Sequence, residues 1–171
     1  MTIDVHRLDT GALLRTYSQI LTELIARGVI RTRNAPAGDL AEYLVAQAYG
    51  GQLAPNSEKS WDVRLPAGTR LQVKCRVVAD SLVGSQIYSV FRSWDFDSCV
   101  FVRLDSATYV VVAAVDVPAE SVRLIARRST HVSGYRVPVR TDFLALPGAV
   151  DVTARLQAVF DQLGGSGGIG L

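Results

Sequence analysis

Apolar positions recur along the chain with two different periods, which predict helices in some segments and strands in others. Over residues 9–27 they recur three and four positions apart, the spacing of one apolar stripe on an amphipathic helix. Residues 39–49 repeat this spacing after Asp39, a good N-cap residue. We expect the first stripe to pack into the core, with a dimer seam as the alternative. In the second helix Glu42 fits either a capping box with Asp39 or a side chain that faces a site.

Alternation with a period of two begins near Trp61. Residues 61–65 and 69–76 alternate around the turn Pro66-Ala67-Gly68, which predicts a tight β-hairpin. In its second strand Leu71, Val73 and Cys75 share one face, and Arg70, Gln72, Lys74 and Arg76 share the other. Continuous apolar runs at 99–104 and 108–115 predict two strands with both faces buried.

Two further helices are predicted in the last third of the chain. Pro118 suits the first position of a helix that runs to about Arg127, and a final helix covers about 151–163. Residues 164–171 are too rich in glycine to hold a fixed conformation. The predicted fold class is α/β, with a central mixed sheet of four or five strands and helices on both sides. The predicted single domain spans 1–163, with an N-terminal helix at 9–27, a core at 38–117, a short strand at 52–54 and C-terminal helices at 118–163.

Composition and charge leave many functions open. The 171 residues are 49% hydrophobic and 20% charged, which is ordinary for one globular domain. The net charge of +2 neither demands nor excludes nucleic acid, because a DNA enzyme can confine its basic residues to one cleft. Cys75 and Cys99 lie in apolar strand patterns, so we expect reduced core residues. No signal peptide opens the chain and its longest apolar run, 109–115, is too short to span a membrane, so we expect a cytoplasmic protein.

The predicted hairpin brings three kinds of polar group together. It folds Asp62 back beside Gln72 and Lys74, so a carboxylate, an amide oxygen and an ammonium meet at one end of a two-stranded unit. Such a set can hold a divalent cation and orient an attacking water. A half-buried strand with a solvated polar face is the alternative. No phosphate-binding glycine loop followed by Lys-Ser or Lys-Thr is present, which argues against nucleoside triphosphate hydrolysis.

The same residues resemble a known catalytic hairpin. Asp62, nine intervening residues and then Gln72-Val73-Lys74 are similar to the motif of the PD-(D/E)XK nucleases, which include many restriction endonucleases and archaeal Holliday-junction resolvases. That motif is an acid at the start of one strand and acid-x-Lys on the next, often with a helical glutamate, which Glu42 matches. Gln72 departs from the usual acid, although a Gln-x-Lys version occurs in the methyl-directed type IV restriction branch. The resemblance covers roughly residues 38–117 and implies a restriction-endonuclease-like core.

The resemblance also implies a metal ion and roles for individual residues. It implies Mg²⁺ or Mn²⁺ as the cofactor, with Asp62 as the first ligand. The Gln72 side-chain oxygen, the Val73 carbonyl and Glu42 complete the expected ligand set. Lys74 would orient the attacking water or stabilise the charge that develops on the phosphate.

Candidate DNA contacts surround this hairpin. The loop before it carries short polar side chains that suit phosphate oxygens or, equally, a turn. Arginines in the basic loop at 29–38 and after the Lys74 strand are further candidates, with a solvated surface as their alternative. The candidates are Asn56, Ser57, Ser60, Arg76, Arg92, Arg31 and Arg33.

Three functions remain open from the sequence. The first is a metal-dependent DNA endonuclease, in restriction or phage defence, for which cleavage of both strands by a single-site enzyme of this size favours a homodimer. The second is a catalytically inactive nuclease-like fold that binds nucleic acid or a protein partner, having lost hydrolysis through Gln72. The third, a plain interaction domain, is favoured by the near-neutral charge.

Overall fold

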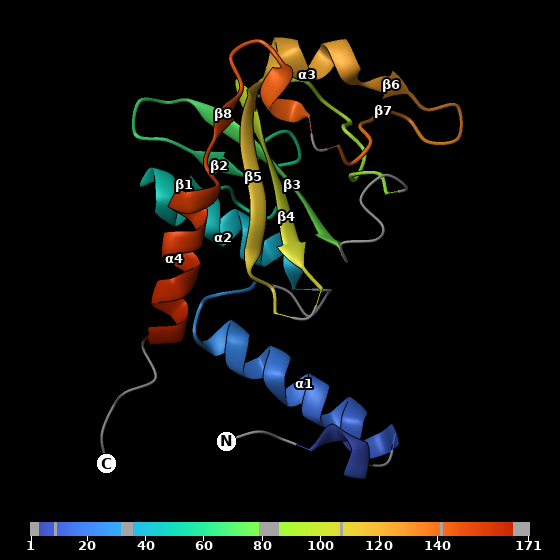
Figure 1. Cartoon of the computed structure of the whole chain (residues 1–171), viewed down its shortest axis with the longest axis vertical. Coiled ribbons are helices and arrows are strands. Elements are labelled where there is room, and N and C mark those ends of the chain that lie inside the picture. The colour runs from blue at the N-terminus through green and yellow to red at the C-terminus, as the bar shows by residue number, and fades with distance from the viewer. Residues whose placement is uncertain are drawn as a thin grey trace.

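The segments with a period of two form one mixed sheet in a computed structural model of the chain (Figure 1), which is of the α/β class. The structure describes residues 4–8, 10–31, 36–78, 86–106, 108–140 and 142–165. Within these ranges the sheet has six strands in the order β1-β2-β3-β4-β5-β8. The strands are β1 (Gln52–Leu53), β2 (Val63–Arg64), β3 (Arg70–Val78), β4 (Ser98–Asp105), β5 (Val111–Pro118) and β8 (Val150–Asp151).

The predicted hairpin and the strand at 99–104 are confirmed. The strand predicted at 108–115 lies three residues later, as β5, and Val112 on it is exposed, so only part of it is buried on both faces. The predicted strand number is too low. β2 and β3 pair antiparallel across the turn, and β4 pairs antiparallel with β5. β3 and β4 lie parallel, with Leu71 opposite Ser98 and Val78 opposite Asp105. The sixth strand, β8, pairs with β5 through only two residues, too few to give a period in the sequence. Two further short strands, β6 (Arg127–Arg128) and β7 (Tyr135–Arg136), pair apart from the main sheet.

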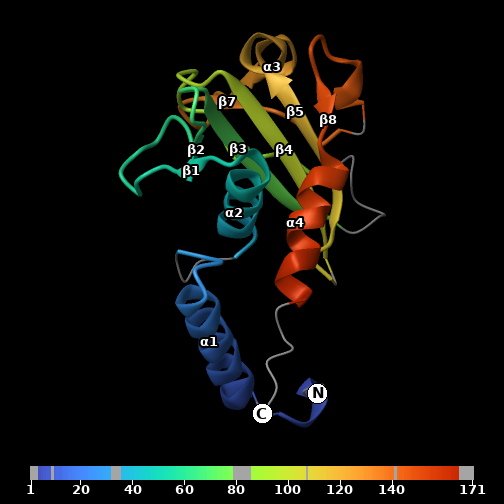
Figure 2. The same cartoon turned by 90° about the vertical axis from the view of Figure 1, so that its left-hand side faces the viewer.

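One face of the sheet is covered by helices, as predicted. α2 (Ala37–Tyr49) and α4 (Thr153–Gly165) lie side by side across it (Figure 2). Their apolar stripes pack on alternate residues of β3, β4 and β5 in a hydrophobic core. The central members of this core are fully buried and include Leu44, Val45, Val100, Val102 and Leu156.

The opposite face is covered mainly by non-helical chain, so the prediction of helices on both sides is correct for one face only. α3 (Ala119–Ile125) packs at one end of β4 and β5. The rest of the cover comes from segments 86–96, 135–140 and 142–146, the last of which includes the short 3-10 helix η3 (Phe143–Ala145). Their aromatic rings form a continuous cluster with Phe101 of β4, whose ring centroid lies 4.5 Å from that of Phe143. Aromatic side chains bury a large apolar area per residue, and loops that carry them can therefore replace a helix.

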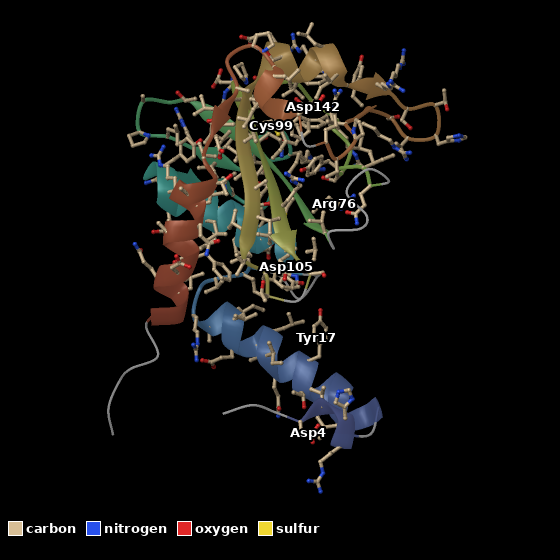
Figure 3. All side chains as sticks on the ribbon, in the orientation of Figure 1. Asp4, Tyr17, Arg76, Cys99, Asp105 and Asp142 are labelled. Carbon is tan, nitrogen blue, oxygen red and sulfur yellow. The ribbon has the colours of Figure 1, made fainter. Side chains whose placement is uncertain are left out.

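The first helix does not pack as predicted. α1 (Thr10–Ala26) follows the 3-10 helix η1 (Val5–Arg7), and its axis lies away from the sheet (Figure 1 and Figure 3). Tyr17 and Ile20 are 48% and 47% exposed, although Leu21 is buried. The period of the sequence predicts which residues form the apolar stripe, but it does not predict which element packs against that stripe. The alternative, a seam with a second chain, stays a prediction.

Two helix ends differ from the predictions. α2 begins at Ala37 with Pro36 as its N-cap, so Asp39 lies inside the first turn, where it accepts a hydrogen bond from the Arg31 backbone N–H at 2.8 Å. The interpretation of Glu42 as the partner of Asp39 in a capping box is therefore wrong. α3 ends at Ile125, so Arg127 and the residue after it belong to β6 and not to the helix.

Other local predictions are confirmed. Gly50 ends α2 in the left-handed region with φ of 62°. Both cysteines are free thiols, with Cys99 fully buried. No helix among the ranges described is long and apolar enough to cross a membrane.

Candidate functional site

The candidate site lies where β2 stops pairing with β3. β2 reaches only as far as Leu71, which accepts a hydrogen bond from the Asp62 N–H at 2.8 Å. At the next open position the Asp62 side chain replaces the missing strand, because its Oδ2 accepts the Val73 N–H at 2.7 Å. The N–H and C=O groups of one residue in a strand point to the same side. The Val73 carbonyl therefore faces the open edge beside the Asp62 carboxylate.

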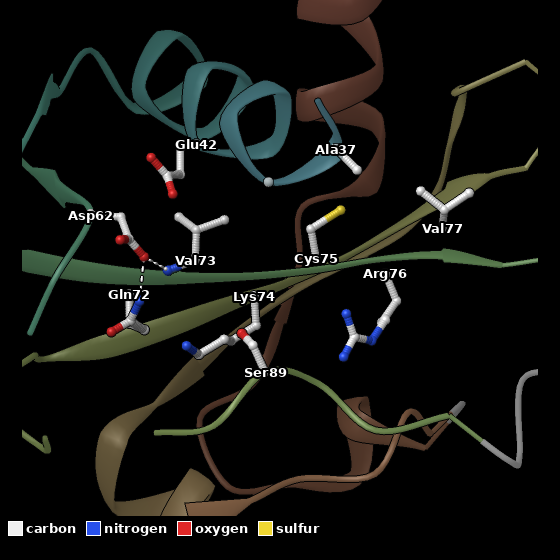
Figure 4. A pocket seen from close by; sticks show the side chains of 11 residues that line it. Ala37, Glu42, Asp62, Gln72, Val73, Lys74, Cys75, Arg76, Val77 and Ser89 are labelled. Carbon is white, nitrogen blue, oxygen red and sulfur yellow. Dashed lines mark hydrogen bonds between the residues drawn. The ribbon is translucent and has the colours of Figure 1, made fainter. Parts of the chain in front are cut away.

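Gln72 turns back onto the same carboxylate. Its side-chain amide donates a hydrogen bond to Asp62 Oδ2 (Figure 4). Both Gln72 and Lys74 are 8% exposed, so the polar face of β3 is not a solvated one. Burial raises the pKa of Asp62, while the hydrogen bond from the Val73 N–H and the charge of Lys74 act in the opposite direction.

Lys74 extends from β3 toward the segment that covers the second face of the sheet. Its ammonium Nζ donates to the Val90 carbonyl at 3.3 Å and lies 4.7 Å from the centroid of the Phe91 ring. Burial lowers the pKa of Lys74, and the carboxylates of Asp62 and Glu42 partly offset this effect. The ammonium is thus held by one carbonyl and one ring, with the carboxylates close enough to affect it.

Glu42 approaches the edge from α2, on the other side of β3 (Figure 4). Its Oε2 lies 2.5 Å from Nη2 of Arg31, and the same guanidinium donates through Nη1 to the Ala54 carbonyl at 2.7 Å. Burial and, next, the nearby Asp62 charge raise the pKa of Glu42 to about 7, and the Arg31 charge acts in the opposite direction. Two half-buried carboxylates thus share one edge, and Glu42 forms an ion pair there with Arg31.

One cavity of about 510 Å³ collects these groups. It opens at the edge of β3, between the first turn of α2 and the 86–91 segment. The predicted residues that line it are Glu42, Asp62, Gln72, Val73, Lys74 and Arg76. The structure thus brings the four predicted catalytic residues into one hollow, together with the predicted carbonyl ligand.

The predicted DNA contacts divide into groups. Arg76 lines the cavity, where its Nε donates to the Ile87 carbonyl at 2.6 Å. Arg31 is held by Glu42 and a backbone carbonyl and does not project from a solvated loop. Arg92 is exposed but lies in a separate hollow, beside residues 128–135. Arg33 falls outside the residues that the structure describes.

The short polar residues before the hairpin do not line the cavity. Asn56 and Ser57 lie in an exposed turn, where the Glu58 N–H bonds to the Pro55 carbonyl at 2.9 Å. The Ser60 N–H donates to Glu58 Oε1 at 2.8 Å. This part of the chain has the hydrogen bonds of a turn, which was the alternative interpretation.

Two features of the site were not predicted. Ser89 lines the cavity, and Figure 4 shows its side chain next to that of Lys74. The sequence gives no signal for this, since 86–91 has neither helical nor strand period. The ion pair of Arg31 with Glu42 was also missed, because it joins a loop to a helix eleven positions further on.

The groups at the open edge fit a hard cation. Mg²⁺ prefers oxygen ligands, keeps several waters and needs only one or two carboxylates. Asp62 and Glu42 supply two carboxylates, the Val73 carbonyl faces the same edge, and rotation of the Gln72 amide would present its oxygen. Burial raises the pKa of the Cys75 thiol to about 12, so this neighbour is not a thiolate ligand. Among the residues described there is no group of three or more His, Cys, Asp or Glu side chains that could hold a metal ion.

Comparison with known proteins adds no family. Neither a known family model nor a curated protein matches the sequence. The structure supports an α/β fold with a mixed six-stranded sheet, and the restriction-endonuclease-like core stays a prediction.

Proposed function

We propose that this protein is a metal-dependent endonuclease that hydrolyses DNA phosphodiester bonds with Mg²⁺ or Mn²⁺, on a restriction-endonuclease-like core. The observation that carries the proposal is the meeting of two carboxylates, a backbone carbonyl and a buried ammonium in one cavity at the open edge of β3. A phosphodiester needs an oriented water and stabilisation of negative charge on the phosphate. These groups are of the kinds that supply both.

The roles follow from where each group is held. Asp62 is the principal ligand, because the Val73 N–H fixes one of its oxygens at the edge. Glu42 stands across the edge and adds the second carboxylate. A bound divalent cation supplies charge stabilisation and lowers the pKa of a bound water. Lys74 lies on the other side of β3, where its ammonium orients the water or stabilises the developing negative charge.

A binding-only function is the second candidate, and one contact favours it. Gln72 brings no charge, and its amide and the Val73 N–H both donate to Asp62 Oδ2, which leaves that oxygen less available to a cation. In that case the protein retains DNA without cleaving it, and retention survives chelation of divalent ions. The two candidates therefore differ in a single measurable property, hydrolysis.

Nicking of supercoiled plasmid in Mg²⁺ and in Mn²⁺ tests the proposal. Wild type is compared with Asp62→Asn, Lys74→Met and, as the matched control, Lys59→Met. Lys59 and Lys74 are the two lysines of the chain, and Lys59 is exposed away from the cavity. We expect the first two variants to lose about 100-fold or more in rate, in the range seen when one electrostatic group is removed, and the control to stay active.

The outcomes separate the candidates. Equal nicking by wild type and both site variants would refute the proposed active site. Absence of nicking by wild type on unmodified and methylated DNA, with binding retained in EDTA, would favour the binding-only function. In that case Gln72→Glu, which restores the usual acid, tests whether the missing charge is the cause.

A further inference from the structure

A long stretch after β5 carries positive charge without any acid. Between Ser121 and Thr141 the sequence has five arginines and one histidine, and it contains no Asp or Glu. The centre of this stretch is the hairpin formed by β6 and β7, on the right in Figure 1. The side chains of this region carry blue nitrogen ends that point outward in Figure 3. The near-neutral net charge of the chain hides this local excess.

The hairpin places like charges directly across from each other. Arg127 pairs with Arg136 in the register of β6 and β7, and Arg128 follows opposite Tyr135. Like charges at directly opposed positions destabilise a strand pair. The opposed charges do not stabilise the hairpin by itself, whereas an anionic ligand bound over both arginines would neutralise their repulsion.

Four guanidinium groups of this region make no ion pair with an acid in the described part of the chain. Arg92, Arg127, Arg128 and Arg136 make no ion pair with a carboxylate of the residues that the structure describes. Several other arginines of the chain do make such pairs. They are Arg27, Arg31, Arg70 and Arg140. The hairpin and the neighbouring Arg92 therefore gather positive charge that no carboxylate in the described part of the chain neutralises by direct contact.

The hairpin is fixed to the wall of the candidate site. Phe91 and Tyr135 exchange two backbone hydrogen bonds of 2.9 Å, and the Tyr88 N–H bonds to the Val137 carbonyl at 2.9 Å. Gly134 has φ of 147°, and a Cβ there would lie 2.4 Å from the Phe91 carbonyl oxygen, so the loop can seat only with glycine at this position. The same 86–91 segment accepts the bonds from Lys74 and Arg76.

Two hollows lie beside the hairpin, and the first of them is next to the candidate cavity. One of about 380 Å³ is lined by Ile87 together with Arg127, Arg128 and Arg136. A second of about 840 Å³ is lined by Arg92 and the loop at 128–135, which supplies hydroxyl groups and backbone amides. Ile87 borders the first hollow and Ser89 borders the site cavity, so one segment of chain separates the two.

We infer that the β6–β7 hairpin, with Arg92, binds the phosphate backbone of duplex DNA that extends from the candidate site. This inference rests on the proposed function, because it names the part of the molecule that holds the substrate. Arginine binds phosphate with two parallel hydrogen bonds, and serine, threonine and backbone N–H groups are the usual further phosphate contacts. A protein partner would instead need buried aromatic or aliphatic anchors at the centre of the surface. The hairpin hollows are lined mainly by arginine and hydroxyl side chains.

Binding in the absence of cleavage tests the inference. Fluorescence anisotropy of a short labelled duplex is measured in EDTA, with the full chain, between about 50 and 200 mM salt. The double variant Arg127→Gln/Arg128→Gln is compared with Arg7→Gln/Arg155→Gln, which removes the same charge from exposed arginines of η1 and α4. We expect the hairpin variant to bind about tenfold more weakly, and its salt slope to fall by about 2, close to one for each phosphate that is no longer neutralised. The control should bind as wild type does.

Further variants keep the test decisive. Arg127→Lys/Arg128→Lys retains the charge and should recover most of the affinity, which would show that the glutamine variant binds weakly because of lost charge and not because of poor folding. Arg92→Gln, on a different segment, should lower the salt slope by about 1. Equal binding by the hairpin variant and the control, no duplex binding by wild type, or equal competition by polyglutamate would each overturn the inference.

The result is separable from the proposed function. Wild type that binds through the hairpin but never nicks DNA would refute the nuclease and leave the inference standing. If Lys74→Met abolishes nicking, while Arg127→Gln/Arg128→Gln changes neither DNA affinity nor nicking rate, the nuclease stands and the inference about the hairpin is refuted.

Discussion

Replacement of Glu42 by glutamine should stabilise the protein above neutral pH and change it little in acid. Burial and the neighbouring Asp62 raise the pKa of Glu42 from 4.5 to about 7 in the folded state. An acid of this kind binds more protons in the folded state than in the unfolded state between these two values, so stability falls as pH rises. Its contribution is fully present below pH 4.5 and is lost by about pH 7.

The size of the effect follows from the shift. A change from 4.5 to about 7 corresponds to about 3 kcal/mol between pH 4.5 and pH 8, at 1.36 kcal/mol for each pKa unit. Glutamine keeps a hydrogen-bond acceptor for Arg31 and removes the titrating charge. The free energy of unfolding of Glu42→Gln should therefore exceed that of wild type by about 2–3 kcal/mol at pH 8, with little difference at pH 4.5.

Urea unfolding at the two pH values, without divalent ions, measures this difference. Glu23→Gln is the matched control, since Glu23 is 60% exposed in its ion pair with Arg27 and should change the unfolding free energy by about 0.5 kcal/mol at most. Repetition at pH 8 with added Mg²⁺ should stabilise wild type more than Glu42→Gln, because a ligand stabilises the state that binds it. An equal effect of Glu42→Gln at both pH values would refute the claim that burial destabilises its charge.

Two further predictions concern residues that hold the site in place. Arg31→Gln removes the group that lowers the pKa of Glu42, so Glu42 should stay protonated to a higher pH. The pH at which added Mg²⁺ begins to raise the melting temperature should therefore be higher in this variant than in wild type. A lower pH would contradict the assigned ion pair. Gly51→Ala should cost about 1–3 kcal/mol in urea unfolding, because the new Cβ would lie 2.7 Å from Cγ1 of the fully buried Val63, and an unchanged midpoint would show that β2 can shift.

The elements most accurately predicted are those that depend on local chemistry. The turn at 66–68 and the alternation around it predict the β2–β3 hairpin, and Gly50 predicts the end of α2. Asp62 meets Gln72 and Val73 for the same reason, since a hairpin fixes which residues face each other within a few positions. The sequence was less informative about the start of α2, where Asp39 bonds to the Arg31 backbone and does not cap the helix.

The environment of the site depends on contacts between distant segments. Lys74 is buried because 86–91, which has no sequence period, folds over the second face of the sheet. The ion pair that lowers the pKa of Glu42 joins two segments that no local sequence rule pairs. The exposed Tyr17 and Ile20 of α1 show that an apolar period does not identify what packs against it.

The sequence by itself therefore determined the hairpin and the kinds of group that meet at its open edge. Only the tertiary structure decided how those groups are charged and what stands beside them, including the arginines of β6 and β7 next to the site. The physical reason is that turn and strand preferences act over a few bonds. Burial and charge interactions depend on which distant segments pack together, and these terms set the pKa values and the electrostatic field of the site.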